Sequence, residues 1–173
     1  MDRSPRELEM ELTRSHTYDA TVDAVIDMLA DADAVTHRYS GMGHRDIDVR
    51  ECERTDESAR IVVHRVVDVD LPGFARKVLA PTNTMVQTDE WHRDGDGWTG
   101  TFDVQVEGAP VEMSGVFSLT PDGDRSLYEV TTTMKVKVPL VGGKIADWAG
   151  KNDVPRTLQA EFDANDEWLA AHP

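Results

Sequence analysis

The chain opens with an alternation of apolar and polar positions that runs over residues 8–18. Every second residue of this stretch is polar, which predicts a strand with one face in solvent. After Thr21, whose hydroxyl suits a helix N-cap, the apolar residues recur at helical spacing. A second short helix is predicted over residues 33–39, and it ends where Gly41 and Gly43 release the chain.

Strand-like runs fill most of the chain from there to residue 138. Two runs come first, over residues 47–54 and 59–71. Four more follow closely, at residues 84–93, 97–106, 111–120 and 126–138. Gly, Asp and Pro fill the short connections between these four, as in tight hairpin turns. Such short loops make neighbouring strands antiparallel, which predicts a meander.

A long helical pattern begins near Gly142 and occupies the end of the chain. Its apolar stripe consists of Ile145, Trp148, Ala149, Pro155, Leu158, Phe162 and Leu169. Pro155 lies inside the pattern, so we expect a kink or a break near Asn152 and Asp153, with Asp153 capping the second piece. The predicted order is therefore one strand, two helices, six strands and one long helix.

This order also predicts a cavity. A seven-stranded antiparallel sheet curls, and its concave apolar face needs a cover. Only the C-terminal helix is long and apolar enough to provide that cover. Because side chains rarely fill the whole space between a curled sheet and one helix, we expect a hollow between them.

The charge of the chain argues against some partners. Asp and Glu number 33 against 18 Lys and Arg, which gives a net charge of −15 over 173 residues. Such a surface repels phosphate backbones and anionic bilayers, so we expect neither a nucleic-acid partner nor stable membrane insertion. The length predicts a single domain over residues 8–170, preceded by a disordered segment at residues 1–7.

Cysteine content and targeting signals bear on disulfides, metal sites and the cellular compartment. Cys52 is the only cysteine, which rules out an intramolecular disulfide and argues against a cysteine-based metal site. The N-terminal residues lack the apolar core of a signal peptide, and no run of 18 apolar residues occurs. We therefore expect a cytoplasmic protein, while the sequence does not indicate its oligomeric state.

Three stretches, together with the element order, resemble a known superfamily. They are RSHTYDATVDAV at residues 14–25, LPGFARKVL at 71–79 and TDEWHRDGDGWTGTFDV at 88–104. Over about residues 8–170 the chain is similar to the START-like, Bet v 1-like helix-grip (SRPBCC) superfamily, and within it to a bacterial family of unknown function. The resemblance implies an α+β helix-grip fold of order β-α-α-β6-α, with a curved seven-stranded antiparallel sheet wrapped around a long C-terminal helix.

The same resemblance implies an internal pocket for lipids, sterols, polyketides or other apolar molecules. Some members of the superfamily are cyclases and others are only carriers, so the fold does not choose between these activities.

The Gly142-Gly143-Lys144 motif raises the question of a phosphate-binding loop. A Walker-type loop needs a longer glycine-spaced segment and a Ser or Thr after the lysine, where this chain has Ile145. We therefore interpret the motif as the hinge between the last strand and the closing helix. The histidines are scattered over different elements without the spacing of metal ligands, and neither a metal nor a cofactor is expected.

Two polar features bear on function. Arg14 and His16 share one face of the first predicted strand. If this face points inward, they line the cavity and hold a carboxylate or an enolate; if the strand is an exposed edge, both reach solvent. The insert at residues 72–81, which carries Arg76 and Lys77 among apolar residues, is either a lid over the cavity mouth or a plug that closes the core.

Asp89 is the candidate for a buried acid with a raised pKa, since it shares its strand face with apolar residues. Its burial would need a partner such as Arg14 or Arg65. For Asp89 we prefer surface placement or a structural ion pair to a catalytic role.

Methionine and aromatic residues at the expected inward positions form the strongest functional signal. They are either core or the adaptable wall of a cavity for an apolar guest. Gly100 and Gly115 share these faces and are expected to leave room. No catalytic residue is assigned. The predicted ligand-contacting residues are Arg14, His16, Phe74, Met85, Gln87, Trp91, Phe102, Met113, Phe117, Met134, Ile145 and Trp148.

Three functions compete on this evidence. The first is a non-enzymatic carrier or sensor that binds or transports a small apolar molecule. The second is a cyclase or dehydratase in which Arg14, His16 or Asp89 moves a proton on a polyketide-like substrate. The third is an interaction module whose acidic surface meets a basic partner. The sequence lacks a convergent catalytic cluster, which ranks the first function above the others.

Overall fold

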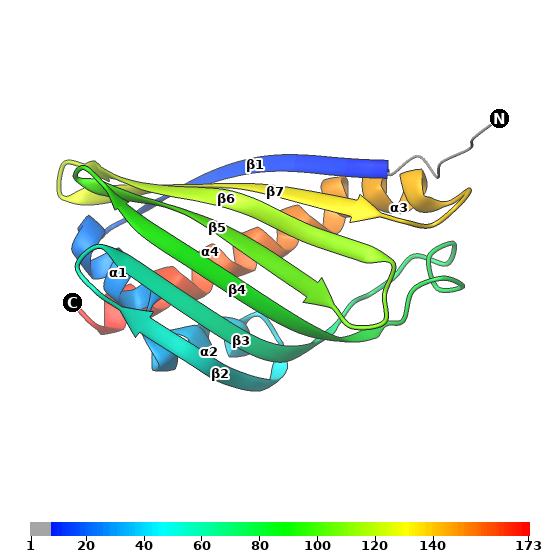
Figure 1. The fold of residues 1–173 in the computed structure, drawn as a ribbon, viewed down its shortest axis with the longest axis horizontal. Coiled ribbons are helices and arrows are strands. Elements are labelled where there is room, and N and C mark those ends of the chain that lie inside the picture. The colour runs from blue at the N-terminus through cyan, green and yellow to red at the C-terminus, as the bar shows by residue number, and fades with distance from the viewer. Residues whose placement is uncertain (1–7) are drawn as a thin grey trace.

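The computed structural model describes residues 8–173, and the segment predicted to be disordered, residues 1–7, lies outside the described residues. The elements follow the predicted order (Figure 1). They are β1 (Leu8–Tyr18), α1 (Val22–Leu29), α2 (Ala32–Gly41), β2 (Arg45–Arg54), β3 (Ser58–Asp68), β4 (Thr82–Asp94), β5 (Gly97–Val106), β6 (Val111–Asp122), β7 (Arg125–Val136), α3 (Gly142–Trp148), a π-helical turn (Ala149–Asp153) and α4 (Val154–Ala171).

The seven strands form one antiparallel sheet in the order β1-β7-β6-β5-β4-β3-β2. Strands β2 to β7 therefore follow one another as neighbours, while β1 pairs with β7, placing Tyr18 opposite Ser126. The sheet curves around α4, which crosses behind it, and α1 and α2 lie near its β2 edge (Figure 1). This architecture confirms the predicted helix-grip fold.

Side chains cap the N-termini of α1 and α2, and the sequence predicts the first of these caps. Thr21 accepts a hydrogen bond from the backbone N–H of Ala24, as its predicted N-cap role requires. Asp31 caps α2 in the same way, through the N–H of Ala34. The first cap lies where the chain leaves β1, and the second lies at the junction between α1 and α2.

Aromatic side chains fill the interior at the end of the sheet where α1 lies. The Trp91 and Phe117 rings stack with their centroids 4.3 Å apart, and the Tyr128 ring lies 6.2 Å from that of Phe117. On α4, Phe162 meets Tyr128 edge-on at 6.0 Å. All four side chains are buried, so this half of the interior is solid core.

Gly100 and Gly115 do not leave room in the interior, contrary to the prediction. The register of β5 and β6 places Gly100 opposite Phe117 and Gly115 opposite Phe102. A side chain at Gly115 would collide with the Phe102 ring and the backbone oxygen of Thr131, and one at Gly100 would meet the Phe117 ring. Each glycine therefore lies under the phenylalanine of its partner strand, which lets these strands coil closely.

The C-terminal helical region continues through Pro155 without a break. A π-helical turn joins α3 to α4, and Pro155 lies in the first turn of α4. The irregularity is thus where the sequence predicts it, but it takes the form of a π-helical turn. The predicted cap is wrong: Asp153 has helical backbone angles, makes no capping bond and accepts a 3.0 Å hydrogen bond from Arg156.

Gly142 and Gly143 form the first turn of α3. The bend that precedes them is made at Leu140, whose φ of 71° is in the left-handed region and whose side chain is fully exposed. The change of direction therefore occurs at Leu140, two residues before the glycines interpreted as the hinge. Among the described residues, no helix combines the length and the apolar character needed to cross a membrane.

Candidate functional site

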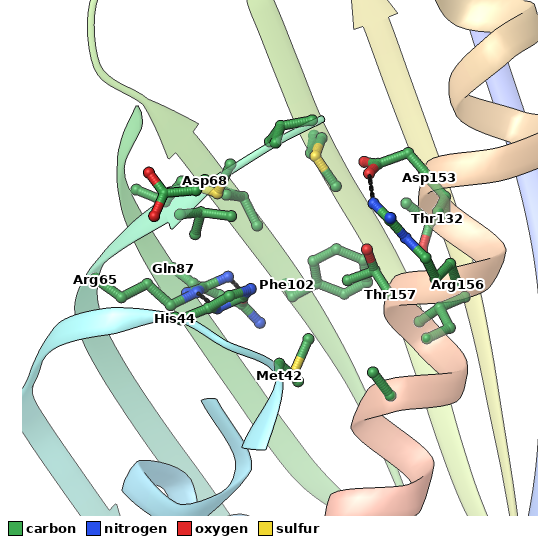
Figure 2. Close-up of a pocket in the computed structure, with 18 residues that line it drawn as sticks. Met42, His44, Arg65, Asp68, Gln87, Phe102, Thr132, Asp153, Arg156 and Thr157 are labelled. Carbon is green, nitrogen blue, oxygen red and sulfur yellow. Dashed lines mark hydrogen bonds and ion pairs between the residues drawn. The ribbon is translucent and has the colours of Figure 1, made fainter. Parts of the chain in front are cut away.

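A cavity of about 370 Å³ lies between the inner face of the sheet and the first turns of α4 (Figure 2). It adjoins the aromatic core at Phe102, whose ring centroid lies 5.2 Å from that of Phe117. Its sheet wall comes from β3 to β7, and its helix wall is the stretch 153–160. The loop between α2 and β2 closes one side with Met42 and His44. Asp68 and Arg156 are exposed members of the wall and mark its rim.

Most of the cavity wall is apolar. The sheet contributes side chains that alternate with outward-facing polar residues, and their partners on α4 come from the buried face of that helix. The apolar members are Met42, Val67, Val69, Met85, Phe102, Val104, Met113, Val154, Leu158 and Ala160. Three methionines among them give a wall that adapts to guests of different shape.

A smaller cavity of about 80 Å³ adjoins the first one beneath residues 69–80. The two cavities share Val69, Met85, Met113 and Asp153 as common wall. The insert covers this end of the interior, since Leu71 and Ala75 are buried in the core and Leu79 lines the smaller cavity.

Arg65 provides the buried charge of the larger cavity. This side chain extends from β3 into the wall and is only 5% exposed. Its Nε donates to His44 Nδ1 at 3.2 Å, and its Nη2 donates to the Gln87 side-chain oxygen at 2.8 Å (Figure 2). The guanidinium also lies over the Tyr39 ring at 4.1 Å. Three neutral groups thus fix its position, while Nη1 has no hydrogen-bond partner among the described residues.

Asp89 is buried next to this group, as predicted for a buried acid, and it takes neither the surface position nor the direct ion pair preferred on sequence grounds. Gln87 stands between the two charges, because its amide nitrogen donates to the Asp89 carboxylate at 2.8 Å while its oxygen accepts from Arg65. Burial raises the pKa of Asp89, against the opposing effects of the Gln87 bond and of Arg38 and Arg65. Arg65 is thus linked to Asp89 through an amide, and Arg14 takes no part.

His44 is a neutral acceptor in this arrangement. Burial, and secondly the Arg65 charge, lower its pKa from 6.5 to about 4. Since Nδ1 accepts from Arg65, the ring proton of the neutral form lies on Nε2. The imidazole also stacks on Tyr39 with centroids 5.6 Å apart, which orients it toward the guanidinium.

The lowered pKa of His44 predicts a pH dependence of stability. In the folded chain the ring resonances of His44 should titrate near pH 4 by NMR, whereas the unfolded chain binds that proton near 6.5. The unfolded state therefore binds more protons between these values, so His44 should weaken the fold as the pH falls from 6.5 toward 4. The free energy of unfolding of a His44→Gln variant, which keeps an acceptor for Arg65, should lack this contribution. Parallel pH profiles of the two proteins, or a midpoint near 6.5, would contradict the assignment.

The predicted ligand-contacting residues fall into three groups. Those at the larger cavity are Met85, Gln87, Phe102 and Met113. Those at the smaller one are Met85, Met113, Met134, Ile145 and Trp148. The remaining five, Arg14, His16, Phe74, Trp91 and Phe117, line neither cavity.

Each of these five has another environment. Trp91 and Phe117 belong to the aromatic core, and Phe74 lies in the insert with the Lys144 ammonium 4.8 Å from its ring. Arg14 is exposed and donates to the backbone oxygen of Thr13. This placement agrees with the exposed-edge alternative, because β1 is an edge strand.

His16 is partly buried but lines neither cavity. Its Nε2 is 2.8 Å from the Asp166 carboxylate, and its ring stacks on Phe162 at 4.8 Å. The imidazole thus joins β1 to α4 outside the cavity. Among residues 8–173, no group of three or more His, Cys, Asp or Glu side chains converges as metal ligands would.

Sequence reasoning missed Met42, His44, Thr132 and Thr157 as wall residues, and it considered Arg65 only as a partner for Asp89. Arg65 could have been found from register, since it occupies the same parity of β3 as Ile61 and Val63 and pairs with Met85. The loop and helix residues carry no such signal, because their approach to the sheet depends on how α2 and α4 pack.

Comparison with solved structures supports the fold. The Zhui aromatase/cyclase from Streptomyces sp. R1128 superposes with a TM-score of 0.61 at 19% identity, covering 92% of each chain. Norcoclaurine synthase from Thalictrum flavum gives 0.60 at 11% identity, covering 96% of this chain and 89% of the synthase. Human STARD10 gives 0.62 at 11% identity, covering 94% of this chain and 66% of that one.

At such low identity these likenesses show the fold alone, which is the START-like, Bet v 1-like helix-grip fold. No curated protein matches the chain in sequence. Residues 13–169 match the profile of a family described as "Protein of unknown function (DUF2505)". Since that match spans nearly the whole described chain, the protein belongs to the DUF2505 family.

Proposed function

We propose that the protein binds a small apolar molecule in the cavity between the sheet and α4, as a carrier or sensor. The observation that carries this proposal is the hollow of about 370 Å³ with a largely apolar wall. Protein interiors are normally close-packed, and the aromatic end of this same interior is solid. A void of this size beside a filled core favours a binding function over incomplete packing.

The size and the wall indicate the kind of guest. The volume lies at the lower end of the roughly 300–1,000 Å³ range of ligand pockets, which favours a chain or a small ring system over a bulky polycyclic molecule. Met42, Met85 and Met113 provide flexible contacts for such a guest. A protein of the same fold gives a precedent, since norcoclaurine synthase has been solved in complex with dopamine and hydroxybenzaldehyde.

The alternative of a cyclase or dehydratase receives less support. Of the three groups considered for proton transfer, Arg14 is exposed and His16 is engaged by Asp166 outside the cavity. Asp89 is buried behind Gln87 and is not part of the cavity wall. None of these three groups therefore faces a guest in the hollow as a proton donor or acceptor, and the wall residues His44 and Asp153 are engaged by Arg65 and Arg156.

Filling the hollow should abolish binding. Thr157 projects from α4 into the cavity (Figure 2), so a Thr157→Trp variant should occupy the space that a guest needs. We expect decanol, a neutral apolar test ligand, to bind the unaltered protein and to lose affinity by about tenfold or more in this variant, measured by isothermal titration calorimetry.

Gln159→Trp is the matched control, because Gln159 is exposed on the same helix and outside the cavity wall. It should bind decanol as the unaltered protein does. Thermal unfolding of both variants checks that they fold. The proposal fails if decanol and a panel of other neutral apolar molecules do not bind the unaltered protein, or if Thr157→Trp binds them as well.

A further inference from the structure

The charged groups in the cavity wall differ in how they are compensated. Asp68 pairs with Arg45 at 3.1 Å, and Asp153 pairs with Arg156 at 3.0 Å. Arg65 has no carboxylate within ion-pair distance among residues 8–173, and its hydrogen-bond partners are the neutral side chains of His44 and Gln87. It is therefore the wall charge that lacks a direct counter-ion in the part of the chain that the structure describes.

Burial makes this lack costly. The guanidinium of a residue that is only 5% exposed loses most of its hydration, and neutral partners replace it only in part. Nη1 has no partner at all among the described residues. Arg65 thus carries an unsatisfied buried donor on a side chain that lines the cavity and is held in place by Tyr39, His44 and Gln87. An anion bound beside this guanidinium would offset the cost of burying its charge.

The carboxyl groups that act on Arg65 from a distance compensate it weakly. Asp89 and Glu161 both interact electrostatically with Arg65, and both interact with Arg38 as well. Burial raises the pKa of each carboxyl, so each holds a proton more readily than an exposed carboxyl does. Two guanidinium groups thus share two carboxyls, and neither carboxyl forms an ion pair with Arg65 at close range.

The distribution of lysine supports an anionic guest independently. All five lysines of the chain lie between Lys77 and Lys151, although the net charge is −15. They occupy the insert, the end of β7 and its continuation, α3 and the π-helical turn, which surround the smaller cavity. Residues 69–81, 107–112 and 135–151 together hold six Lys and Arg against four Asp and Glu, or against six once the adjacent wall residues Asp68 and Asp153 are counted. The cavity end is therefore the less negative end of an acidic protein, and an anion meets less repulsion there.

We infer that the guest is an apolar carboxylic acid in its ionised form, with its carboxylate at Arg65 and its apolar part along Met85 and Met113. This inference rests on the proposed function, because it names the head group of the molecule that fills the same cavity. A carboxylate supplies the counter-ion that the wall lacks and accepts hydrogen bonds in the planar geometry that a guanidinium offers. The two methionines continue from the larger cavity into the smaller one, which suits an extended chain.

Decanoate and decanol have the same chain length and differ only in the head group. Together they therefore test the apolar binding site and the carboxylate subsite at Arg65 separately. In isothermal titration calorimetry, the unaltered protein should bind decanoate about tenfold or more tighter than decanol. Arg65→Met keeps a similar shape without the charge, so the ratio of the two affinities should fall close to one. Arg60→Met, a change on the same strand where Arg60 pairs with Glu51 and Glu90 outside the cavity, should keep the ratio of the unaltered protein.

The outcomes separate the two proposals. If decanol and decanoate bind equally well and Arg65→Met does not alter their ratio, the carboxylate inference is overturned while the proposed function stands. If neither molecule binds the unaltered protein, the proposed function fails first.

A second measurement needs no variant and covers the case in which Arg65→Met does not fold. The carbon resonance of carboxyl-labelled decanoate reports its ionisation, and a guanidinium next to the bound carboxylate should lower the ligand pKa relative to free decanoate. An apolar pocket without that contact would raise the pKa, and a raised value would overturn the inference.

Discussion

Gly115→Val is expected to lower the midpoint of thermal unfolding by roughly 6–12 °C or more, which corresponds to a loss of at least about 3 kcal/mol in a domain of this size. A β-carbon at this position would collide with the Thr131 backbone oxygen and with the Phe102 ring. The backbone oxygen belongs to the β6–β7 ladder and cannot move without breaking it. The ring is itself buried against Phe117, with centroids 5.2 Å apart.

Gly73→Ala is the control for this prediction, since an added β-carbon at Gly73 would meet no atom within 4 Å and its φ is not in the left-handed region. Its unfolding midpoint should stay within about 2 °C of the original value, because such a change acts mainly on the unfolded chain. A Gly115→Val protein that unfolds as late as Gly73→Ala would show that β5 and β6 are not held together by the paired phenylalanine and glycine.

The same pair of strands shows why the fold is easier to predict than the cavity. Period-two alternation identifies β5 and β6 and their inward residues, and the short Glu107–Pro110 loop makes them antiparallel. Alternation does not say whether an inward glycine is left open or covered. That depends on register, which puts Phe102 over Gly115 and Phe117 over Gly100. One residue of slip would have produced different neighbours.

The division of the interior into a solid half and a hollow half also escapes sequence reasoning. Trp91 and Met85 share one face of β4 and are equivalent in pattern, yet Trp91 stacks in the core and Met85 lines both cavities. The difference arises from what lies opposite on α4. Phe162 reaches the aromatic cluster through Tyr128, whereas the shorter side chains of Thr157 and Ala160 face the hollow.

The burial of polar residues is the feature that the sequence pattern predicts least well. An arginine within an apolar run can belong to a solvent-facing strand or to a buried network, and Arg14 and Arg65 illustrate the two cases on similar patterns. What separates them is position in the sheet: Arg14 lies on edge strand β1, whereas Arg65 lies on β3 between two neighbours and under Tyr39 of α2. The contribution of α2 comes from tertiary packing, which local periodicity does not encode.

The second buried arginine leads to the other large prediction. Arg38, near the end of α2, is 3% exposed, and its Nε donates to the side-chain oxygen of Asn165 at 2.9 Å. The amide nitrogen of Asn165 donates in turn to the Tyr18 hydroxyl at 2.9 Å. Asn165, which is 1% exposed, therefore ties α4 to both α2 and β1 with one amide.

Asn165→Leu should cost about 2–5 kcal/mol, seen as a fall of roughly 10 °C in the unfolding midpoint, because it leaves a buried guanidinium and a buried hydroxyl without partners. Asn165→Asp should cost less at neutral pH. A carboxylate there accepts from Arg38 and from the Tyr18 hydroxyl, and it supplies that arginine with a direct counter-ion. Asn152→Leu, at an exposed site before α4, is the control and should leave the midpoint within about 2 °C.

The ordering of these variants tests the network more strictly than any single value does. If Asn165 only fills space, leucine, which has the same branching and the same number of side-chain heavy atoms, should be tolerated better than a buried carboxylate. If Asn165 is needed as the hydrogen-bond partner of Arg38, Asn165→Asp should be more stable than Asn165→Leu. The reason is that a buried cation without a direct partner is worse than an ion pair in the same place. Finding Asn165→Leu as stable as the original protein, or more stable than Asn165→Asp, would mean that α4 is held over the sheet by its apolar face alone.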